Sequence, residues 1–512
     1  MSTPATDIPN SVWNRAYLKE QLNKALLNPV RAFRIAYLPL LMVYFAYGAL
    51  GITAIAESFW VKQQLKMSAA ELAALGVWLT LPWTIKMVFG ELVDSTAIMG
   101  SQRRAYVYIG AGLVAGGLAT LAAAAGGSLP NLAPDTAYKI AMLLITVGVV
   151  LQDVVADAMT TEVVQRENPD GTPRPQADID RDLGMVQVLG RLSLSIGAFL
   201  TAGLGGWLAS FLPYSTVFLL ALAVPALSAT GAALVHNGPV KQRPIDWRIL
   251  GGGLAFGAFV LAMAFGNVAY GQEIVFVVSM VVVIMMLRHV VSGVDPATQR
   301  MIFYAALIIF AFRAMPGVGS SYTWFMIDVL GFNETFQGTL AQIGTGFALA
   351  GMWLFSDAIT RQPIARVLLW LTLVNSAMGL PNLALVFGVH TWTERVFGVG
   401  AHGIALIDAA ASSPFAQLSM IPMLTLIAIY APADRRASWF ALMASLMNLA
   451  LVAGNLGTKY LNAIWIVPRG EYNELPTLLV VVLVIGLVVP VTTILLLGRR
   501  LRRSEAARNG IT

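Results

Sequence analysis

The sequence predicts an all-α polytopic membrane protein with about 14 transmembrane helices. Of its 512 residues, 57% are hydrophobic and only 12% are charged, and the mean hydropathy is +0.72. This balance lies far from that of a soluble domain. Apolar runs recur between short polar clusters, and a helix of about 20 apolar residues crosses the roughly 30 Å hydrocarbon core of a bilayer. The alternating pattern of membrane strands is absent, so the spans are predicted to be helices.

The hydropathy profile also gives the position of each span along the chain. In order, the spans are predicted at residues 37–58, 70–93, 105–126, 138–164, 184–209, 213–235, 249–268, 273–291, 301–326, 336–358, 366–388, 399–430, 437–463 and 475–498. The pair at 249–291 returns the chain to the same side of the membrane. An arrangement of about 12 spans, with this pair outside the helix bundle, therefore remains an alternative.

An internal repeat divides the predicted spans into two sets. The stretch YLPLLMVYFAYGALGITAIAESFW, from Tyr37, is echoed by MIFYAALIIFAFRAMPGVGSSYTWF, from Met301. Each has an apolar start, a glycine-rich middle and an aromatic end, which predicts two related six-helix bundles. The expected organisation is a cytoplasmic N-terminal segment (1–36), a first bundle (37–235), a cytoplasmic linker with an inserted transmembrane hairpin (236–300), a second bundle (301–498) and a basic cytoplasmic tail (499–512).

The distribution of basic residues predicts the orientation in the membrane. Alternate loops and both termini are rich in Arg and Lys, whereas the opposite loops hold few: Lys62, Lys66, Lys139, Arg395 and Arg469. Cytoplasmic loops carry such an excess, so both termini are expected inside, in a cytoplasmic (inner) membrane. Topology thus explains the net charge of +6. We therefore expect the lipid bilayer, and not nucleic acid, as the partner of these charges.

Several functional classes are disfavoured by missing residues. Cysteine is absent and the four histidines are scattered, which argues against a metal site. No GxxxxGK[ST] motif is present, so ATP-driven transport through a P-loop is excluded. No HxH, DDxxD or Ser-His arrangement marks an enzyme. We expect a gradient-driven transporter that is monomeric and needs no cofactor; a membrane enzyme or a receptor-like protein is the alternative.

Three acids, Asp153, Asp157 and Asp408, are clearly embedded within predicted spans, away from the span ends. A charge near the bilayer centre costs about 3 kcal/mol on insertion scales, so such residues face a partner or a water path. Asp153 and Asp157 are one helical turn apart and share a face. Two nearby carboxylates at low dielectric disfavour double ionisation, which would make one a proton acceptor. The alternative is a structural ion pair, with Arg191 at the depth of Asp157.

The inner loop GELVDSTAIMGSQRR predicts a latch between two helices. Gly90 would allow a close helix approach, and Asp94 would face the guanidinium groups of Arg103 and Arg104. Such contacts can form in one conformation and break in another. The segment SDAITRQPIAR, with Asp357 and Arg361, is a weaker second copy. Glu162, close to the interface, is expected to be solvated or paired with a loop.

Two buried cations suggest an anionic substrate. Lys86 and Arg313 lie in spans of opposite halves and would face a central cavity. For Lys86, substrate contact, helix pairing and snorkelling remain open. Candidates for stacking on a planar ligand are Trp83, Tyr322 and Trp324, although aromatic residues near span ends also form interfacial belts.

Three stretches together resemble the folate-biopterin transporter family of the major facilitator superfamily. They are LPWTIKMVFGELVDSTAIMGSQRRAYVYI, LQDVVADAMTTE and IPMLTLIAIYAPADRRASWFALMASLMNLALVAGNLG. The resemblance implies a major-facilitator-type fold and a symporter that moves folates or pterins by alternating access, commonly with protons. It places the latch residues, Lys86, Asp153, Asp157 and Glu162 at family positions.

The resemblance also extends the list of candidates. It makes Asp408 a further proton-coupling candidate beside Asp153 and Asp157, and it makes Arg191 a possible partner for a substrate carboxylate. One departure is the loop APADRR, residues 431–436, which lacks the Cys, Gly and Glu of the family pattern. The related muropeptide permeases share features of the second stretch, so a muropeptide or another anionic solute is the alternative cargo.

Overall fold

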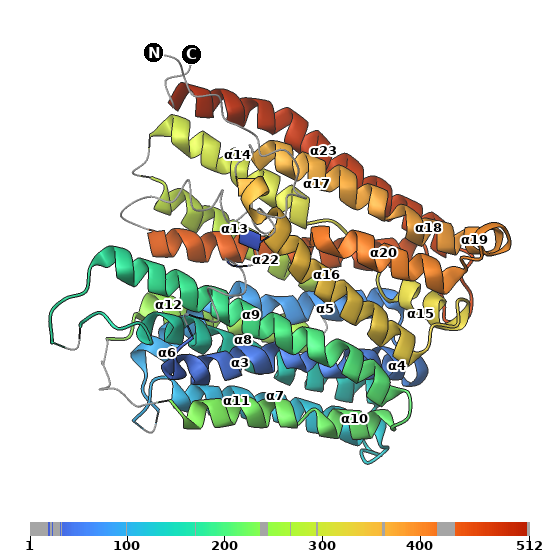
Figure 1. Cartoon of the computed structure of the whole chain (residues 1–512), viewed down its shortest axis with the longest axis horizontal. Helices are drawn as coiled ribbons and strands as arrows, with labels where there is room; N and C mark the ends of the chain where they lie inside the picture. Colours follow the sequence, from blue (N-terminus) through green and yellow to red (C-terminus); the bar gives the residue numbers. More distant parts are fainter. Residues whose placement is uncertain are drawn as a thin grey trace.

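The computed structural model describes residues 19–20, 23, 31, 33–98, 100–168, 170–235, 244–266, 268–292, 295–360, 364–416 and 436–508. Most of this part of the chain is helical and none of it forms a named strand (Figure 1). Two isolated bridges close short loops, between Ile98 and Ser101 and between Glu167 and Pro173. The predicted all-α class is confirmed.

The first set of helices runs from η2 to α11, and its first span is made of the four consecutive pieces η2, α3, η3 and α4. The elements of the set are η2 (Ile35–Tyr37), α3 (Leu38–Ala49), η3 (Leu50–Thr53), α4 (Ala54–Gln64), α5 (Ala69–Thr84), α6 (Lys86–Ser95), α7 (Arg104–Ala125), α8 (Pro134–Glu162), α9 (Gln176–Ala209), α10 (Tyr214–Leu220) and α11 (Ala223–Ala233). A capping box between Ser68 and Glu71 starts α5, because each residue satisfies a backbone amide of the other.

The second set follows a helical hairpin. The elements are α12 (Trp247–Phe265) and α13 (Gly271–Val290) of the hairpin, then α14 (Pro296–Arg313), α15 (Ser320–Asp328), α16 (Glu334–Thr360), α17 (Ile364–Met378), α18 (Leu380–Val386), α19 (Val389–Phe397), α20 (Ala401–Ala416), α22 (Arg436–Ile464) and α23 (Leu475–Arg508). A helix therefore occupies every predicted span, except that the span 399–430 begins on α20 and continues into residues 417–435, outside the described residues.

Ten helical segments in the described ranges are long and apolar enough to cross a membrane, and up to 11 are if the bent pair α19 and α20 counts as one span. The angle within that pair is 99°. The hairpin helices α12 and α13 are both among the ten. The remaining predicted spans fall on α14 with α15, on α16 and on α22.

Close packing within the first set depends on small residues. Between α7 and α8, a Cβ atom added at Gly148 would lie 2.6 Å from the carbonyl oxygen of Gly110. No side chain fits at that distance, so the two backbones touch directly. Small residues allow such close approach in membranes, where apolar side chains gain little by leaving lipid.

The two sets meet along two helix pairs, α5 with α22 and α9 with α16. Figure 1 shows these four helices between α3, α7 and α11 on one side and α14, α17 and α23 on the other. At the second pair, a Cβ at Gly206 would lie 2.6 Å from Cα of Gly338. At the first pair, Asn448 Nδ2 donates to the carbonyl oxygen of Trp83 at 2.9 Å, and Ser445 Oγ donates to that of Thr84 at 3.1 Å.

The hairpin is attached to the α5 and α22 pair. Gln272, on α13, donates from Nε2 to the carbonyl oxygen of Ala74 on α5 at 2.9 Å. From α22, Lys459 Nζ lies 2.6 Å from Glu273 Oε1 and the Tyr460 phenol donates to the same oxygen at 2.6 Å. Lys459 thus pairs with an acid within the protein. At the other end, α12 packs against α6.

Candidate functional site

A cluster of charged groups joins α6 to α8 within the first set. Lys86 is the first residue of α6, because the helical path is interrupted at Ile85, whose ψ is 21°. Its Nζ lies 2.5 Å from Asp153 Oδ2 and 2.6 Å from Asp157 Oδ2. The two acids are on one face of α8, as their spacing predicts. One ammonium therefore bridges two carboxylates, and the acids outnumber the base.

A third helix contributes aromatic groups to this cluster. The phenol of Tyr44, on α3, donates a hydrogen bond to Asp157 Oδ1 at 2.8 Å. One turn later, Tyr47 stacks on Trp83 of α5, with ring centroids 6.1 Å apart and an angle of 24° between the planes. Tyr44 is not among the candidates predicted from the sequence. Its phenol is a polar group within an apolar run, and that pattern is the sequence signal that could have indicated a polar partner such as Asp157.

The cluster changes two interpretations of the sequence. The ion pair expected between Asp157 and Arg191 does not form: in the described part of the chain Arg191 makes no ion pair, and its side chain is exposed. Lys86 takes that position because it reaches α8 from the start of α6. Among the interpretations left open for Lys86, its contacts support helix pairing.

The inner-loop latch forms with one arginine. Arg103 Nη2 lies 2.8 Å from Asp94 Oδ1 and 2.6 Å from Glu162 Oε1, and its Nε donates to Glu162 Oε1 at 3.0 Å. Arg104 does not share this role; its guanidinium lies over the ring of Tyr108, 6.0 Å from the centroid. Glu162 at the end of α8 therefore completes the latch, as a loop-pairing charge.

Two parts of the latch prediction, the role of Gly90 and the second copy, are not confirmed. At Gly90 an added Cβ would meet no atom of the described residues within 4 Å, so the expected close helix approach is not found in that part of the chain. In the second copy, the side chain of Asp357 and the whole of Arg361 lie outside the described residues. The second latch therefore stays a prediction.

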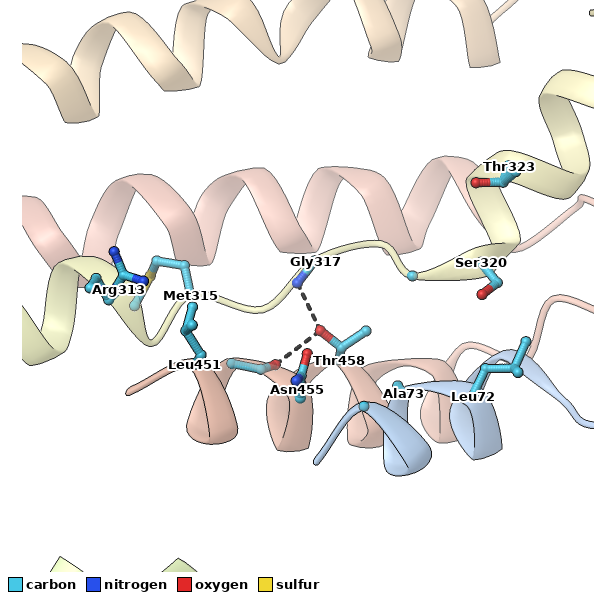
Figure 2. A pocket seen from close by; sticks show the side chains of 13 residues that line it. Leu72, Ala73, Arg313, Met315, Gly317, Ser320, Thr323, Leu451, Asn455 and Thr458 are labelled. Carbon is cyan, nitrogen blue, oxygen red and sulfur yellow. Dashed lines mark hydrogen bonds between the residues drawn. The ribbon is translucent and has the colours of Figure 1, made fainter. Parts of the chain in front are cut away.

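A cavity of about 360 Å³ lies where α5, α22 and the break between α14 and α15 meet. Arg313 ends α14, and α15 begins only at Ser320. Between them, the Gly317 amide donates to Thr458 Oγ1 of α22 at 2.8 Å (Figure 2). Lys86 does not line this cavity, so the expectation that both cations face one cavity is wrong for the cavity at Arg313.

Three other candidates lie around α15. The phenol of Tyr322 donates to Asn382 Oδ1 at 2.7 Å, and Tyr322 is near enough to Asp408 for an electrostatic interaction. In the described part of the chain, Asp408 Oδ1 is buried without a hydrogen-bond partner. Trp324 is only 2% exposed, and the guanidinium of Arg469 lies 4.0 Å from the centroid of its ring. Arg469 thus covers the ring of Trp324, so this ring is not open to stacking by a ligand in this conformation.

The two helix sets are also joined at one end of the molecule. Lys62, at the end of α4, forms an ion pair with Asp328 at the end of α15, and the phenol of Tyr472 donates to the same carboxylate. Burial and the hydrogen bond to Asp328 raise the pKa of Tyr472, so its phenol remains a donor at neutral pH.

A second polar contact lies beside the first. Tyr214, which starts α10, donates to Glu334 Oε1 at 2.7 Å, and Glu334 starts α16. Gln63 Nε2 donates to the Tyr214 phenol at 3.2 Å. We call Lys62, Asp328, Tyr472, Tyr214 and Glu334 the outer contacts, after the side on which the distribution of basic residues places them.

These features define a class of protein. Two sets of membrane helices meet along a seam, charged groups pair within the spans, and a polar cavity opens beside the seam. No group of three or more His, Cys, Asp or Glu in the described ranges could hold a metal ion. The arrangement is that of a multi-pass membrane transporter.

Comparisons with known proteins support this class and give the family. The model of the BT1 family matches residues 48–509, and the chain belongs to that family. It is 25% identical over 481 residues to the folate-biopterin transporter of Synechocystis sp., covering 91% of this chain and 82% of that protein. It is 22% identical over 477 residues to "Probable folate-biopterin transporter 4" of Arabidopsis thaliana, covering 87% and 92%.

Solved structures show the same fold. The crystal structure of a POT family transporter in complex with a thioalcohol-conjugated peptide matches with a TM-score of 0.61 at 14% identity, covering 90% of this chain and 96% of that one. The predicted major-facilitator-type fold is therefore confirmed. The relatives and the structural neighbours are transporters and not enzymes, and this chain is a transporter of the BT1 type.

Proposed function

We propose that the protein is a secondary active transporter that moves a small organic anion of the folate or pterin type together with protons. The main support is the contact of Lys86 with both Asp153 and Asp157. Protonation of either acid would weaken its hold on Lys86, so proton binding is linked to the packing of α6 against α8. Asp408, on α20, is a second candidate for proton binding.

Alternating access is the mechanism that fits this arrangement. The outer contacts join the two helix sets at one end, through exposed or half-buried charges that can separate at small cost. The Arg103 latch lies within the first set, where it holds α8 against the loop between α6 and α7. Opening of the outer contacts, with closure at the opposite end, would expose a central site to each side in turn.

The substrate is proposed from the relatives. Proteins named as folate-biopterin transporters match this chain over most of its length. A folate has a planar ring for stacking and carboxylates for a cation. The basic candidates are Arg313, which lines the cavity beside the seam, and Arg191, which is exposed on α9. A muropeptide or another anionic solute is the second candidate. We further propose that a monomer acts in the cytoplasmic membrane, with both termini inside.

Uptake of radiolabelled folate into proteoliposomes, with and without an inward proton gradient, tests this function. The gradient is expected to raise accumulation in the wild type and to have no effect in the Asp153→Asn/Asp157→Asn double variant. Asp170→Asn is the matched control, because Asp170 lies in an exposed loop. Accumulation that ignores the gradient in the wild type, or a double variant that still responds, would contradict proton coupling.

A further inference from the structure

We propose that the cavity at Arg313 binds the transported molecule through a carboxylate, with Arg313 as the carboxylate-binding residue and the hydroxyl-lined end as the site for its neutral polar part. The assignment rests on the proposed function and deepens it. It names the chemical class of the substrate and the orientation of the substrate within the cavity.

The composition of the cavity wall favours a ligand with one anionic end. Among the described residues that line it, Arg313 is the single charged one. A guanidinium presents paired donors in a plane, which match the two oxygens of a carboxylate. Its position inside the membrane, at the end of α14, lowers the local dielectric and strengthens this recognition.

At the opposite end of the cavity, the described polar residues carry no charge. Figure 2 shows Arg313 and Met315 at one end of the break in the helix and Ser320 and Thr323 at the other. Asn455 and Thr458 of α22 lie along the wall between them. Hydroxyl and amide groups donate and accept hydrogen bonds, so this end suits a neutral ring that carries both donors and acceptors.

The break between α14 and α15 makes room for such a molecule. Pro316 cannot donate a helical hydrogen bond and disfavours helix at Met315 before it, so the chain leaves the helix there. Gly319 has φ of 75°, which lets the chain turn into α15. The resulting cavity of about 360 Å³ lies within the usual range for small-molecule sites, roughly 300–1,000 Å³.

The position of the cavity connects binding to transport. Its walls come from α5 of the first helix set and from α14, α15 and α22 of the second. Asn455 Nδ2 donates to Thr80 Oγ1 across this boundary at 3.2 Å. Relative movement of the two sets would therefore change the shape of the cavity, as a transport site requires.

A comparison of two ligands tests the carboxylate assignment. Binding of folate and of folate diamide, in which both carboxylates are replaced by carboxamides, is measured by calorimetry on the purified full chain in detergent. The wild type is expected to prefer folate by about tenfold or more, the effect of a charge-assisted pair. In Arg313→Gln this preference is expected to fall to within about twofold, and in Arg313→Lys to an intermediate value.

Controls separate this result from misfolding. Arg395→Gln removes an exposed arginine on α19 and should keep the preference of the wild type. The chain contains no cysteine, so single-cysteine variants can be labelled selectively. Folate is expected to slow maleimide labelling of Ser320→Cys by about fivefold or more. Labelling of Ser210→Cys, an exposed position after α9 that does not line the cavity, should be unchanged.

The outcomes distinguish this inference from the proposed function. A preference for folate that survives Arg313→Gln, equal labelling of Ser320→Cys with and without folate, or no saturable folate binding by the wild type would each overturn the assignment. These measurements need no proton gradient. Uptake by the wild type that ignores the gradient, together with a folate preference that is lost in Arg313→Gln, would contradict proton coupling and support the carboxylate assignment.

Discussion

The phenol of Tyr44 donates a hydrogen bond of 2.8 Å to Oδ1 of Asp157, while the other oxygen of that carboxylate contacts Lys86. One acid on α8 therefore holds α3 and α6 at the same time. A change in the charge of Asp157 acts on both contacts together. This shared attachment gives the first two predictions.

Removal of Lys86 is expected to destabilise the protein because Asp153 and Asp157 would then repel one another. We expect Lys86→Met to lower the free energy of unfolding by about 2 kcal/mol, less than for a fully buried pair because Lys86 is 32% exposed. The Lys86→Met/Asp157→Asn variant should recover part of that loss. Thermal unfolding in detergent measures both, and a double variant that is no more stable than the single one would contradict the mutual repulsion.

Tyr44→Phe removes one hydrogen bond and leaves the ring in place. Loss of the donor to Asp157 is expected to cost about 1 kcal/mol of stability. Tyr47→Phe is the matched control, because Tyr47 contributes its stacked ring to Trp83. The same thermal measurement decides the outcome, and equal effects of the two substitutions would show that the Tyr44 hydroxyl is dispensable.

The latch predicts unequal effects for two adjacent arginines. Arg103→Gln should lower stability by about 2 kcal/mol, because Asp94 and Glu162 both lose their partner. Arg104→Gln should change stability by less than about 0.5 kcal/mol, because the contact that Arg104 makes with Tyr108 is exposed to solvent. Chemical denaturation of the two variants provides the comparison. If Arg104→Gln lowered stability as much as Arg103→Gln, the assignment of the latch to Arg103 would be wrong.

The outer contacts predict a shift in conformation without a loss of folding. Asp328→Asn weakens the ion pair with Lys62, which is worth about 0.2–1 kcal/mol for exposed pairs, so a state open at that end should gain up to about fivefold in population. A membrane-impermeant maleimide should then label Thr323→Cys faster by a similar factor. Asp170→Asn provides the control. An unchanged labelling rate in Asp328→Asn would show that this pair does not hold the two helix sets together.

The positions of the helices could be predicted from the sequence because the length of an apolar run determines whether it spans the bilayer. Their partners were harder to predict. Hydropathy gives the depth of Asp157 and Arg191 but not the rotation of each helix about its axis, so matched depth suggested the wrong partner. The interruption at Ile85, which directs Lys86 to α8, has no strong sequence signal.

Two other features, the helix break at Pro316 and the latch, are indicated by the order of the residues and not by overall composition. Pro316, with glycines on its far side, indicates the break that forms the cavity at Arg313. The latch residues could be recognised as a group, but Arg103 and Arg104 are adjacent and chemically identical. The structure shows that Arg103 meets the acids, whereas Arg104 contacts Tyr108 one turn further along α7.

The attachment of α13 has a mechanical consequence. Gln272 is bound to α5, and its neighbour Glu273 is bound to Lys459 and Tyr460 of α22. Two adjacent residues of one helix thus hold both members of a pair that belongs to different helix sets. Separation of α5 from α22 at this end would break the bonds of α13 to one of the two helices. The end of the hairpin would therefore act as a pivot for relative movement of the two helix sets. The largest displacements of α5 and α22 would occur at the ends furthest from Gln272.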